Sequence, residues 1–336
     1  MRVELKPLAE QVIVITGASS GIGLATAMAA ASQGAKVVLS SRNEAALAEL
    51  EKLIRAEGGE AIHVVADVSR SEDIEALAAA TIGAYGSFDT WVNNAGQGLY
   101  GRLDEVSEED HRQLFDVNFW GLVNGTIVAA RHMKASGGGA IINLGSVVAD
   151  IGFPIQGMYS ASKHAIKGFT DAFRMEMANE SAPISVTLIK PSAIDTPFPR
   201  HAKTYLENTP TLPPPVYMPQ DVAEAILYAA VHGGRDYYIG GGGKLMSSLN
   251  KHLPGIVDWF GANFVPKQSV KKEKLDRDPK GTLSSPGLDG ESRGDADGLV
   301  RRSAYTKAVE HPVLTGAALA ALALGAIGMV SRNGRG

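Results

Sequence analysis

The segment Tyr159-Ser-Ala-Ser-Lys163 places a phenol and an ammonium group four residues apart, and Ser146 lies thirteen residues before the tyrosine. Residues four apart share one face of a helix. On that face the ammonium can lower the pKa of the phenol, so that Tyr159 becomes an acid or base usable near neutral pH. Taken alone the spacing is a weak signal, since the same pair also occurs on solvated helix faces. The elements around it decide between the two readings.

Short apolar or β-branched runs alternate with longer stretches rich in Ala, Leu and Glu from Val12 to about Trp259. The runs are VIVIT at 12–16, KVVLS at 36–40, IHVVA at 62–66, TWVNN at 90–94, AIINL at 140–144, SVTLI at 185–189 and DYYIG at 236–240, and helical stretches include 43–57 and 71–84. This alternation predicts repeated βαβ units. We therefore expect an α/β fold, a Rossmann-like doubly wound parallel sheet with helices on both faces.

The composition narrows the classes of function. A formal net charge of -4 gives no electrostatic reason to expect a nucleic-acid partner. The chain has no cysteine and its eight histidines form no ligand pattern, so we expect no metal site. The first twenty residues lack a basic start followed by a long apolar stretch and a cleavage site, which predicts a cytoplasmic catalytic domain.

The first apolar run leads directly into a glycine-rich turn, Gly17-Ala-Ser-Ser-Gly21-Ile-Gly23, and then into a helical stretch. Glycines allow a tight turn and let backbone N–H groups approach a pyrophosphate at a helix N-terminus. A plain glycine turn is the alternative. The strand before the turn and the helix after it meet the structural condition for a dinucleotide-binding motif.

The second apolar run ends at Ser40-Ser41-Arg42, a position that bears on the choice of cofactor. An acidic residue there accepts the ribose 2′-OH of NAD, whereas an arginine suits a 2′-phosphate. Positions 36–43 contain no Asp or Glu, so the sequence predicts NADP(H) in preference to NAD(H). The alternative is that Arg42 is an ordinary surface charge.

With these residues assembled, the chain resembles the short-chain dehydrogenase/reductase family in its compact single-domain form. The matching motifs follow in order from residue 10 to about 260: TGASSGIG at 16–23, Asp67-Val68, NNAG at 93–96, Asn118 in VNFWG, Ser146, Tyr159-x-x-x-Lys163 and PSAIDTP at 191–197. Ser192 departs from the family, which usually has glycine there. The resemblance implies hydride transfer between a nicotinamide and a carbonyl or secondary alcohol, in a homodimer or homotetramer.

The resemblance also implies a role for each matched residue. The catalytic set is Asn118, Ser146, Tyr159 and Lys163, with Ser146 donating to the carbonyl oxygen, Tyr159 delivering the proton, Lys163 keeping that proton transferable and Asn118 anchoring a water. The cofactor set is Gly17, Ser19, Ser20, Gly21, Ile22, Gly23, Ser41, Arg42, Asp67, Val68, Asn94, Ala95, Gly96, Tyr159, Lys163, Pro191, Ile194 and Thr196. As alternatives, Ser146 caps a turn and Asn118 satisfies buried backbone groups.

Substrate specificity is expected in residues 149–157 and 192–219. The lining candidates are mostly apolar and favour a hydrophobic carbonyl compound or alcohol: Phe153, Pro154, Ile155, Phe198, Tyr205 and Leu212. Five prolines between 210 and 219 indicate either a lid of preferred shape or a proline-rich surface connection.

The composition changes after residue 264, which we take as the end of a domain at 1–264. Residues 265–311 mix charged residues with Gly, Ser and Pro, and this predicts a polar flexible linker. Residues 313–330 are uncharged and as a helix would extend ~27 Å. We hypothesise that 312–331 forms a hydrophobic C-terminal helix that anchors the chain in a membrane. Docking of this helix on a partner subunit is the alternative.

Two other classes of function remain open. A non-catalytic dinucleotide-binding scaffold or sensor, tethered by the C-terminal helix, would need the glycine turn but not the intact Ser146, Tyr159 and Lys163. An epimerase or dehydratase can share the tyrosine and lysine, but usually has another glycine spacing and a larger substrate domain.

Overall fold

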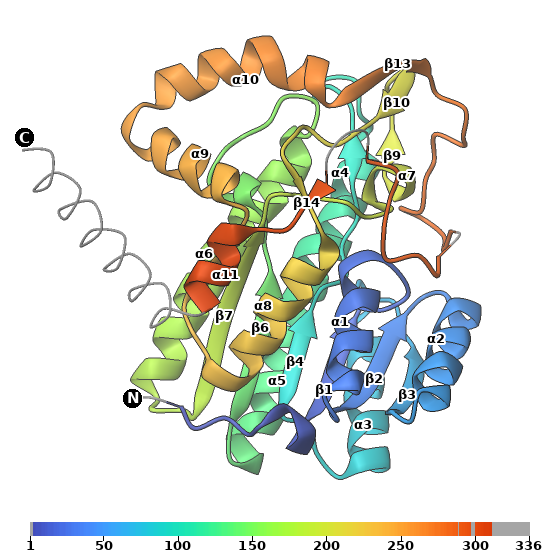
Figure 1. The fold of residues 1–336 in the computed structure, drawn as a ribbon, viewed down its shortest axis with the longest axis vertical. Helices are drawn as coiled ribbons and strands as arrows, with labels where there is room; N and C mark the ends of the chain where they lie inside the picture. The colour runs from blue at the N-terminus through green and yellow to red at the C-terminus, as the bar shows by residue number, and fades with distance from the viewer. Residues whose placement is uncertain (1–2, 288, 297–299, 311–336) are drawn as a thin grey trace, which may run out of the picture.

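Seven parallel strands form the central sheet of the computed structural model, which describes residues 3–287, 289–296 and 300–310 (Figure 1). The strands are β1 (Val12–Thr16), β2 (Lys36–Ser41), β3 (Glu60–Val65), β4 (Thr90–Asn93), β6 (Gly139–Leu144), β7 (Ile184–Pro191) and β12 (Asp236–Ile239). Their order across the sheet is β12-β7-β6-β4-β1-β2-β3, and each strand overlaps one of the seven predicted runs. The predicted fold class is confirmed.

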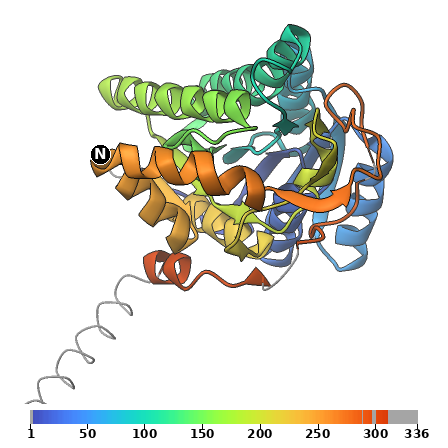
Figure 2. The same ribbon diagram turned by 90° about the horizontal axis from the view of Figure 1, so that it is seen from above.

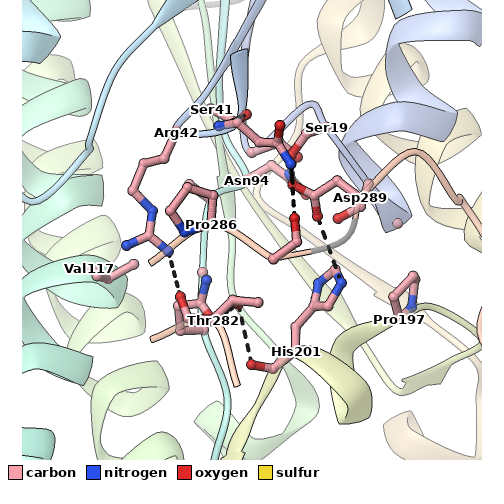
Figure 3. Close-up of a pocket in the computed structure, with 18 of the residues that line it drawn as sticks. Ser19, Ser41, Arg42, Asn94, Val117, Pro197, His201, Thr282, Pro286 and Asp289 are labelled. Carbon is pink, nitrogen blue, oxygen red and sulfur yellow. Dashed lines mark hydrogen bonds and ion pairs between the residues drawn. The ribbon is translucent and has the colours of Figure 1, made fainter. Parts of the chain in front are cut away.

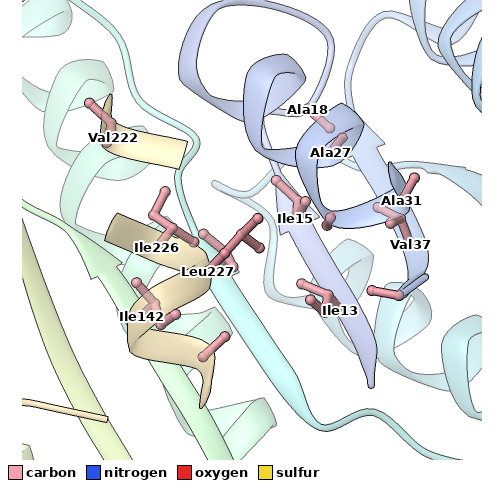
Figure 4. Packing of buried hydrophobic residues seen from close by; sticks show 14 of the residues in the cluster. Ile13, Ile15, Ala18, Ala27, Ala31, Val37, Ile142, Val222, Ile226 and Leu227 are labelled. Atoms are coloured by element: carbon pink, nitrogen blue, oxygen red, sulfur yellow. The ribbon is translucent and has the colours of Figure 1, made fainter. Parts of the chain in front are cut away.

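Helices cover both faces of the sheet, as a doubly wound fold requires. One face carries α1 (Gly21–Ser32), α2 (Glu44–Ala56) and α8 (Pro219–His232), and the other carries α3 (Ser71–Tyr85), α5 (Gly121–Ser136) and α6 (Gly157–Asn179). Alternate side chains of β1 pack against the helices on opposite faces of the sheet, because successive residues of a strand point to opposite sides. Ile13 and Ile15 pack with α1 and α8 (Figure 4), whereas Val12 and Val14 pack with α3, α5 and α6.

The carboxyl ends of β1 and β4 meet at the point where the strand order reverses. In open α/β sheets, ligands bind in the crevice at this point. Gly17 follows β1 with a φ of +66°, and a Cβ there would lie 2.8 Å from the Cα of Ala95 in the loop after β4. Only glycine fits this close approach, so the predicted glycine turn lies directly against the end of β4.

Shorter elements surround the carboxyl edge of the sheet, where α9 and α10 run across the top of the molecule (Figures 1 and 2). They are β5 (Leu99–Tyr100), α4 (Glu108–Phe115), η2 (Asp116–Trp120), η3 (Val147–Ala149), β8 (Ala193–Ile194), α7 (Phe198–His201), β9 (Lys203–Thr204), β10 (Asn208–Pro210), β11 (Val216–Tyr217), α9 (Gly241–His252), α10 (Pro254–Gln268), β13 (Val270–Lys274), β14 (Val300–Arg301) and α11 (Ala304–Glu310). The short helix η1 (Leu8–Glu10) lies at the opposite edge, directly before β1.

Residues 265–310 differ from the flexible linker that their composition predicts. The expected boundary at 264 falls inside α10, β13 pairs antiparallel with β10, and β14 pairs parallel with β11. Arg302 Nε donates at 2.5 Å to the Asp221 carboxylate, whose side chain is wholly buried in α8. The segment is thus held by main-chain pairing and by ion pairs with buried acids, which compensate for its small apolar surface.

Between β13 and β14 the chain crosses the carboxyl edge of the sheet in a segment with neither helix nor strand, residues 276–287 and 289–296, which we call the strap (Figure 1). The Gly290 amide donates to the Ser19 carbonyl at 2.9 Å, and the Gly21 amide donates to the Glu291 carbonyl at 2.9 Å. Arg293 Nε donates at 2.9 Å to the Asp195 carboxylate, which is 2% exposed. The strap is therefore docked on the glycine turn and on the loop after β7.

The hydrophobic helix predicted at 312–331 lies outside the described residues. Within the part of the chain that the structure describes, no helix combines the length and the apolar character needed to cross a bilayer.

A methyl group at Gly294 tests the docking of the strap. Its carbon would lie 2.3 Å from the carbonyl oxygen of Thr196, a backbone atom that cannot swing aside. Gly294→Ala should therefore lift the strap and accelerate trypsin cleavage after Arg277 and Arg293, measured by mass spectrometry of the fragments. Gly83→Ala is the matched control, because nothing lies within 4 Å of its Cβ position. Unchanged cleavage in Gly294→Ala would contradict this docking.

Candidate active site

Ser146, Tyr159 and Lys163 converge on one cavity of about 430 Å³, which we call the catalytic cavity. Ser146 follows β6, and its hydroxyl caps η3 by accepting from the Val148 amide at 3.2 Å. Tyr159 and Lys163 lie in the first turns of α6, where the four-residue spacing puts them on one side of the helix. The structure therefore brings together the three groups that the sequence singles out.

Lys163 is a buried amine, with 6% of its surface exposed. Its Nζ donates to the Leu144 carbonyl at 2.9 Å and lies 5.7 Å from the centroid of the Tyr159 ring. Burial lowers the pKa of Lys163 to about 8, because the charged form loses hydration. The ammonium still predominates at neutral pH, close enough to respond to charge on the phenol.

The pKa of Tyr159 shifts in the direction opposite to the one that the sequence predicts. Burial raises it, hydrogen bonding with Ser146 lowers it by less, and the resulting pKa is about 12. Burial dominates because a buried phenolate oxygen loses its hydration, and Lys163 Nζ donates to the Leu144 carbonyl. The phenol consequently holds its proton at neutral pH, as a proton donor must.

Asn118 is buried in the π-helical turn η2 between α4 and α5. Its Nδ2 donates to the Gln97 carbonyl at 3.0 Å, and its Oδ1 accepts from the Gln97 amide at 2.7 Å. Nδ2 also donates to Ser162 Oγ at 3.3 Å, and that hydroxyl donates to the Tyr159 carbonyl at 2.7 Å. Asn118 thus satisfies buried backbone groups and connects them to the start of α6. Its part in holding a water stays a prediction.

A second cavity follows the glycine turn, and we call it the turn cavity (Figure 3). Most of the predicted cofactor residues line it: Gly17, Ser19, Ser20, Gly21, Ile22, Ser41, Arg42, Asp67, Val68, Asn94, Ala95, Gly96 and Thr196. Ile22, Asn94, Gly96 and Thr196 line both cavities, so the two are continuous. Tyr159, Lys163, Pro191 and Ile194 line the catalytic cavity.

The predicted Gly23 lies behind the turn and packs against it. A Cβ at this position would lie 2.1 Å from the Gly17 carbonyl oxygen and 2.7 Å from Asn94 Nδ2. The turn therefore forms a tight backbone cradle at the start of α1. Such a cradle at a helix N-terminus fits the phosphates of a dinucleotide, because the helix dipole and nearby amides favour anions.

The strap forms part of the wall of the turn cavity, which Thr282, Pro286, Gly287 and Asp289 line. Figure 3 shows Asp289 on the side of Ser19 and Thr282 beside His201. The Arg42 guanidinium donates to the Thr282 carbonyl at 2.6 Å and to the Leu283 carbonyl at 3.2 Å. The sequence gives no signal for these residues, because they follow Arg42 by some 240 positions and belong to no motif.

Leu283 anchors the strap in the protein. Its side chain is fully buried in a cluster with Leu99 and Leu114, and Tyr159 packs against the same cluster. The strap therefore contacts Arg42 at the turn cavity through its carbonyls and the cluster around Tyr159 through the Leu283 side chain.

The residues predicted to line the substrate side divide into two groups. Phe153, Phe198 and Leu212 line the catalytic cavity. Tyr205 turns elsewhere, since its hydroxyl donates to the Asp110 carboxylate. Residues 154–155 lie in the turn before α6, where the carbonyl of residue 155 accepts from the amide of residue 101 at 2.8 Å.

The roof of the catalytic cavity comes from α9 and α10, which the sequence does not link to the substrate. Their lining residues are Gly242, Gly243, Leu245, Met246, Phe260, Val265 and Gln268. The walls of the catalytic cavity are thus largely apolar.

A sequence model described as short chain dehydrogenase matches residues 11–205, which is more than half of the chain. The matched span contains the glycine turn, Ser146, Tyr159 and Lys163. The chain belongs to the short-chain dehydrogenase/reductase family. It is accordingly an NAD(P)-dependent oxidoreductase.

Individual short-chain dehydrogenases and oxidoreductases show how far the similarity extends. The uncharacterized oxidoreductase YxnA of Bacillus subtilis is 44% identical over 324 residues, covering 96% of this chain and 91% of YxnA. A 3beta-hydroxysteroid dehydrogenase of Mediterraneibacter gnavus is 36% identical over 193 residues, or 56% of this chain and 68% of that protein. A crystal structure of a short-chain type dehydrogenase/reductase from Mycobacterium marinum is 28% identical, with a TM-score of 0.62, and covers 70% of this chain and 96% of that one.

The buried Lys163 predicts a dependence of stability on pH. Its pKa is about 8 in the folded chain and 10.5 as the ordinary value, so the unfolded state binds more protons between these pH values. The free energy of unfolding attributable to Lys163 should therefore rise with pH in this window, by roughly 3 kcal/mol. Lys163→Met removes this contribution. The free energy of unfolding of Lys163→Met should therefore exceed that of the wild type most near pH 7, and this difference should shrink towards pH 10.5.

Urea unfolding of both proteins across this range measures the difference. Lys52→Met is the matched control, because its side chain is 76% exposed. A difference between wild type and Lys163→Met that does not change with pH would mean that the amine is not desolvated by the fold.

Proposed function

We propose that this short-chain dehydrogenase/reductase is an NADP(H)-dependent enzyme that interconverts hydrophobic carbonyl compounds and secondary alcohols, with Tyr159 as general acid and base. The convergence of Ser146, Tyr159 and Lys163 in one largely apolar cavity, continuous with the turn cavity, is the observation that carries the proposal. The hydroxysteroid dehydrogenase among its relatives, named for an apolar secondary alcohol, supports the substrate class.

The chemistry follows from where the three groups lie. A bound nicotinamide supplies or accepts the hydride. Ser146 donates a hydrogen bond to the substrate oxygen and stabilises the negative charge that develops there. Tyr159 donates its proton to the same oxygen, and the nearby Lys163 ammonium stabilises the phenolate that remains. In alcohol oxidation these groups act in reverse.

Arg42 is the residue that would hold a 2′-phosphate. It lies on the turn cavity next to Ser41, and Asp67 Oδ2 is 3.9 Å from its Nη1. Two of its N–H groups donate to strap carbonyls, and a guanidinium has further N–H groups for a phosphate.

We also propose the homodimer or homotetramer that the family resemblance implies.

Tyr159→Phe tests the catalytic assignment. Removal of the phenolic proton should lower turnover at least ~10²-fold, the scale of general acid–base catalysis, and leave NADPH binding intact. Turnover is followed by nicotinamide absorbance with a panel of aldehydes, ketones and alcohols. Tyr100→Phe is the matched control, because Tyr100 also lines the catalytic cavity. Equal turnover by Tyr159→Phe would refute the role, and a wild type that binds NADPH but converts no compound would favour the scaffold.

Arg42→Ala tests the cofactor preference. Loss of hydrogen bonds between a guanidinium and a phosphate, worth ~1.5–3 kcal/mol, should raise the KM for NADPH roughly 10- to 100-fold and change that for NADH little. Arg70→Ala is the control, since Arg70 pairs instead with Asp73 at 3.6 Å on the surface. Equal use of NADH and NADPH by the wild type would contradict the preference.

A further inference from the structure

The roof of the catalytic cavity, α9 and α10, also carries exposed apolar side chains. Of the twelve large hydrophobic side chains that are exposed among the described residues, five lie in this segment: Leu245, Leu253, Ile256, Trp259 and Phe264. Trp259 is 61% exposed and Ile256 59%. Single exposed apolar residues are ordinary, but such a concentration marks an interaction surface.

This apolar surface continues into the catalytic cavity. The ring centroid of Trp259 lies 5.5 Å from that of Phe264, which stacks on Phe260 at 5.1 Å. Phe260 lines the cavity, and so does Leu245, although Leu245 is 60% exposed. Apolar side chains thus lead without interruption from the outer side of the roof to the cavity that holds Tyr159.

The roof and β13 together have a net charge opposite in sign to that of the whole chain. Residues 241–274, which comprise α9, α10 and β13, contain six lysines against one aspartate and one glutamate, a formal net charge of +4, whereas the chain carries -4. Figures 1 and 2 show α10 across the top of the molecule and β13 directly following it. Apolar groups and lysines are therefore gathered in one continuous segment.

We propose that the roof docks on the surface of an anionic lipid bilayer, and that lipophilic carbonyl compounds or alcohols in that bilayer reach the catalytic cavity past it. Aromatic and aliphatic side chains insert at the boundary between headgroups and acyl chains, and lysines attract anionic headgroups. A second copy fits this surface less well, because two roofs of equal positive charge repel each other. The substrate part of this inference rests on the proposed function, whereas the docking part does not.

Sedimentation of the full chain with vesicles tests the docking without cofactor or substrate. The wild type should bind vesicles of phosphatidylcholine and phosphatidylglycerol, and should bind pure phosphatidylcholine or high-salt samples at least about tenfold more weakly. Ile256→Ser/Trp259→Ser should also weaken binding to the anionic vesicles at least about tenfold. Leu53→Ser/Ile82→Ser is the matched control, since it removes two exposed apolar side chains from α2 and α3 and should bind like the wild type.

Equal binding of the roof variant and the wild type to anionic vesicles would overturn the proposal, because another part of the chain, such as 312–331, would then be responsible. The proposal would also be overturned if the wild type does not bind vesicles and the roof variant has a different sedimentation mass from the wild type. The roof would then be a surface for self-association.

A second measurement tests the route of the substrate. Turnover of a short soluble ketone should be the same in both double variants, whereas turnover of a long-chain ketone supplied in anionic vesicles should fall at least about tenfold in the roof variant alone. If the roof variant converts the long-chain ketone in vesicles as fast as the control double variant does, this route is overturned. If the wild type converts neither ketone, the proposed function fails while the vesicle result still decides the docking.

Discussion

The burial of the Lys163 ammonium is the constraint on which the rest of the site depends. A cation taken out of water is costly unless polar groups face it, and here its Nζ is held by the carbonyl of Leu144, at the end of β6. The same strand end leads to Ser146, and the same helix carries Tyr159. Because β6 is buried along its whole length between β4 and β7, the amine, the hydroxyl and the phenol are fixed relative to one another by the interior of the sheet.

The parts of this structure that the sequence predicts are those with local signals. Alternating apolar runs predict the seven sheet strands, and the strand-glycine-helix order predicts the turn packed against Ala95. The direction of the Tyr159 pKa shift is not predictable in this way, because it depends on burial by residues from distant segments. The docking of residues 265–310 is also missed, since composition does not reveal that buried acids such as Asp195 and Asp221 accept from arginines about 80 to 100 positions later.

The C-terminal quarter of the chain completes both cavities. The roof covers the catalytic cavity, β13 pairs with β10 of the proline-rich loop, and the strap walls the turn cavity. The Mycobacterium marinum structure covers nearly all of its own length but only 70% of this chain. The similarity to YxnA spans 324 residues, more than the predicted 264-residue domain, so it extends into the C-terminal segment. Elements outside residues 11–205, which the family model matches, thus line both cavities.

Docking of the strap and the proposed binding of a phosphorylated cofactor would be linked equilibria, because both would involve Gly21 and Arg42. The Gly21 amide and the Arg42 guanidinium donate to carbonyls of Glu291, Thr282 and Leu283. A phosphate at the Gly21 amide would replace a neutral acceptor with a charged one, which forms hydrogen bonds about twice as strong, whereas at Arg42 it would share the guanidinium with the strap carbonyls. By reciprocity, whatever changes the affinity of the strap for these donors changes the affinity of the cofactor correspondingly. The strap thus contacts Arg42 through its carbonyls and, through the buried Leu283, packs in the cluster that Tyr159 touches.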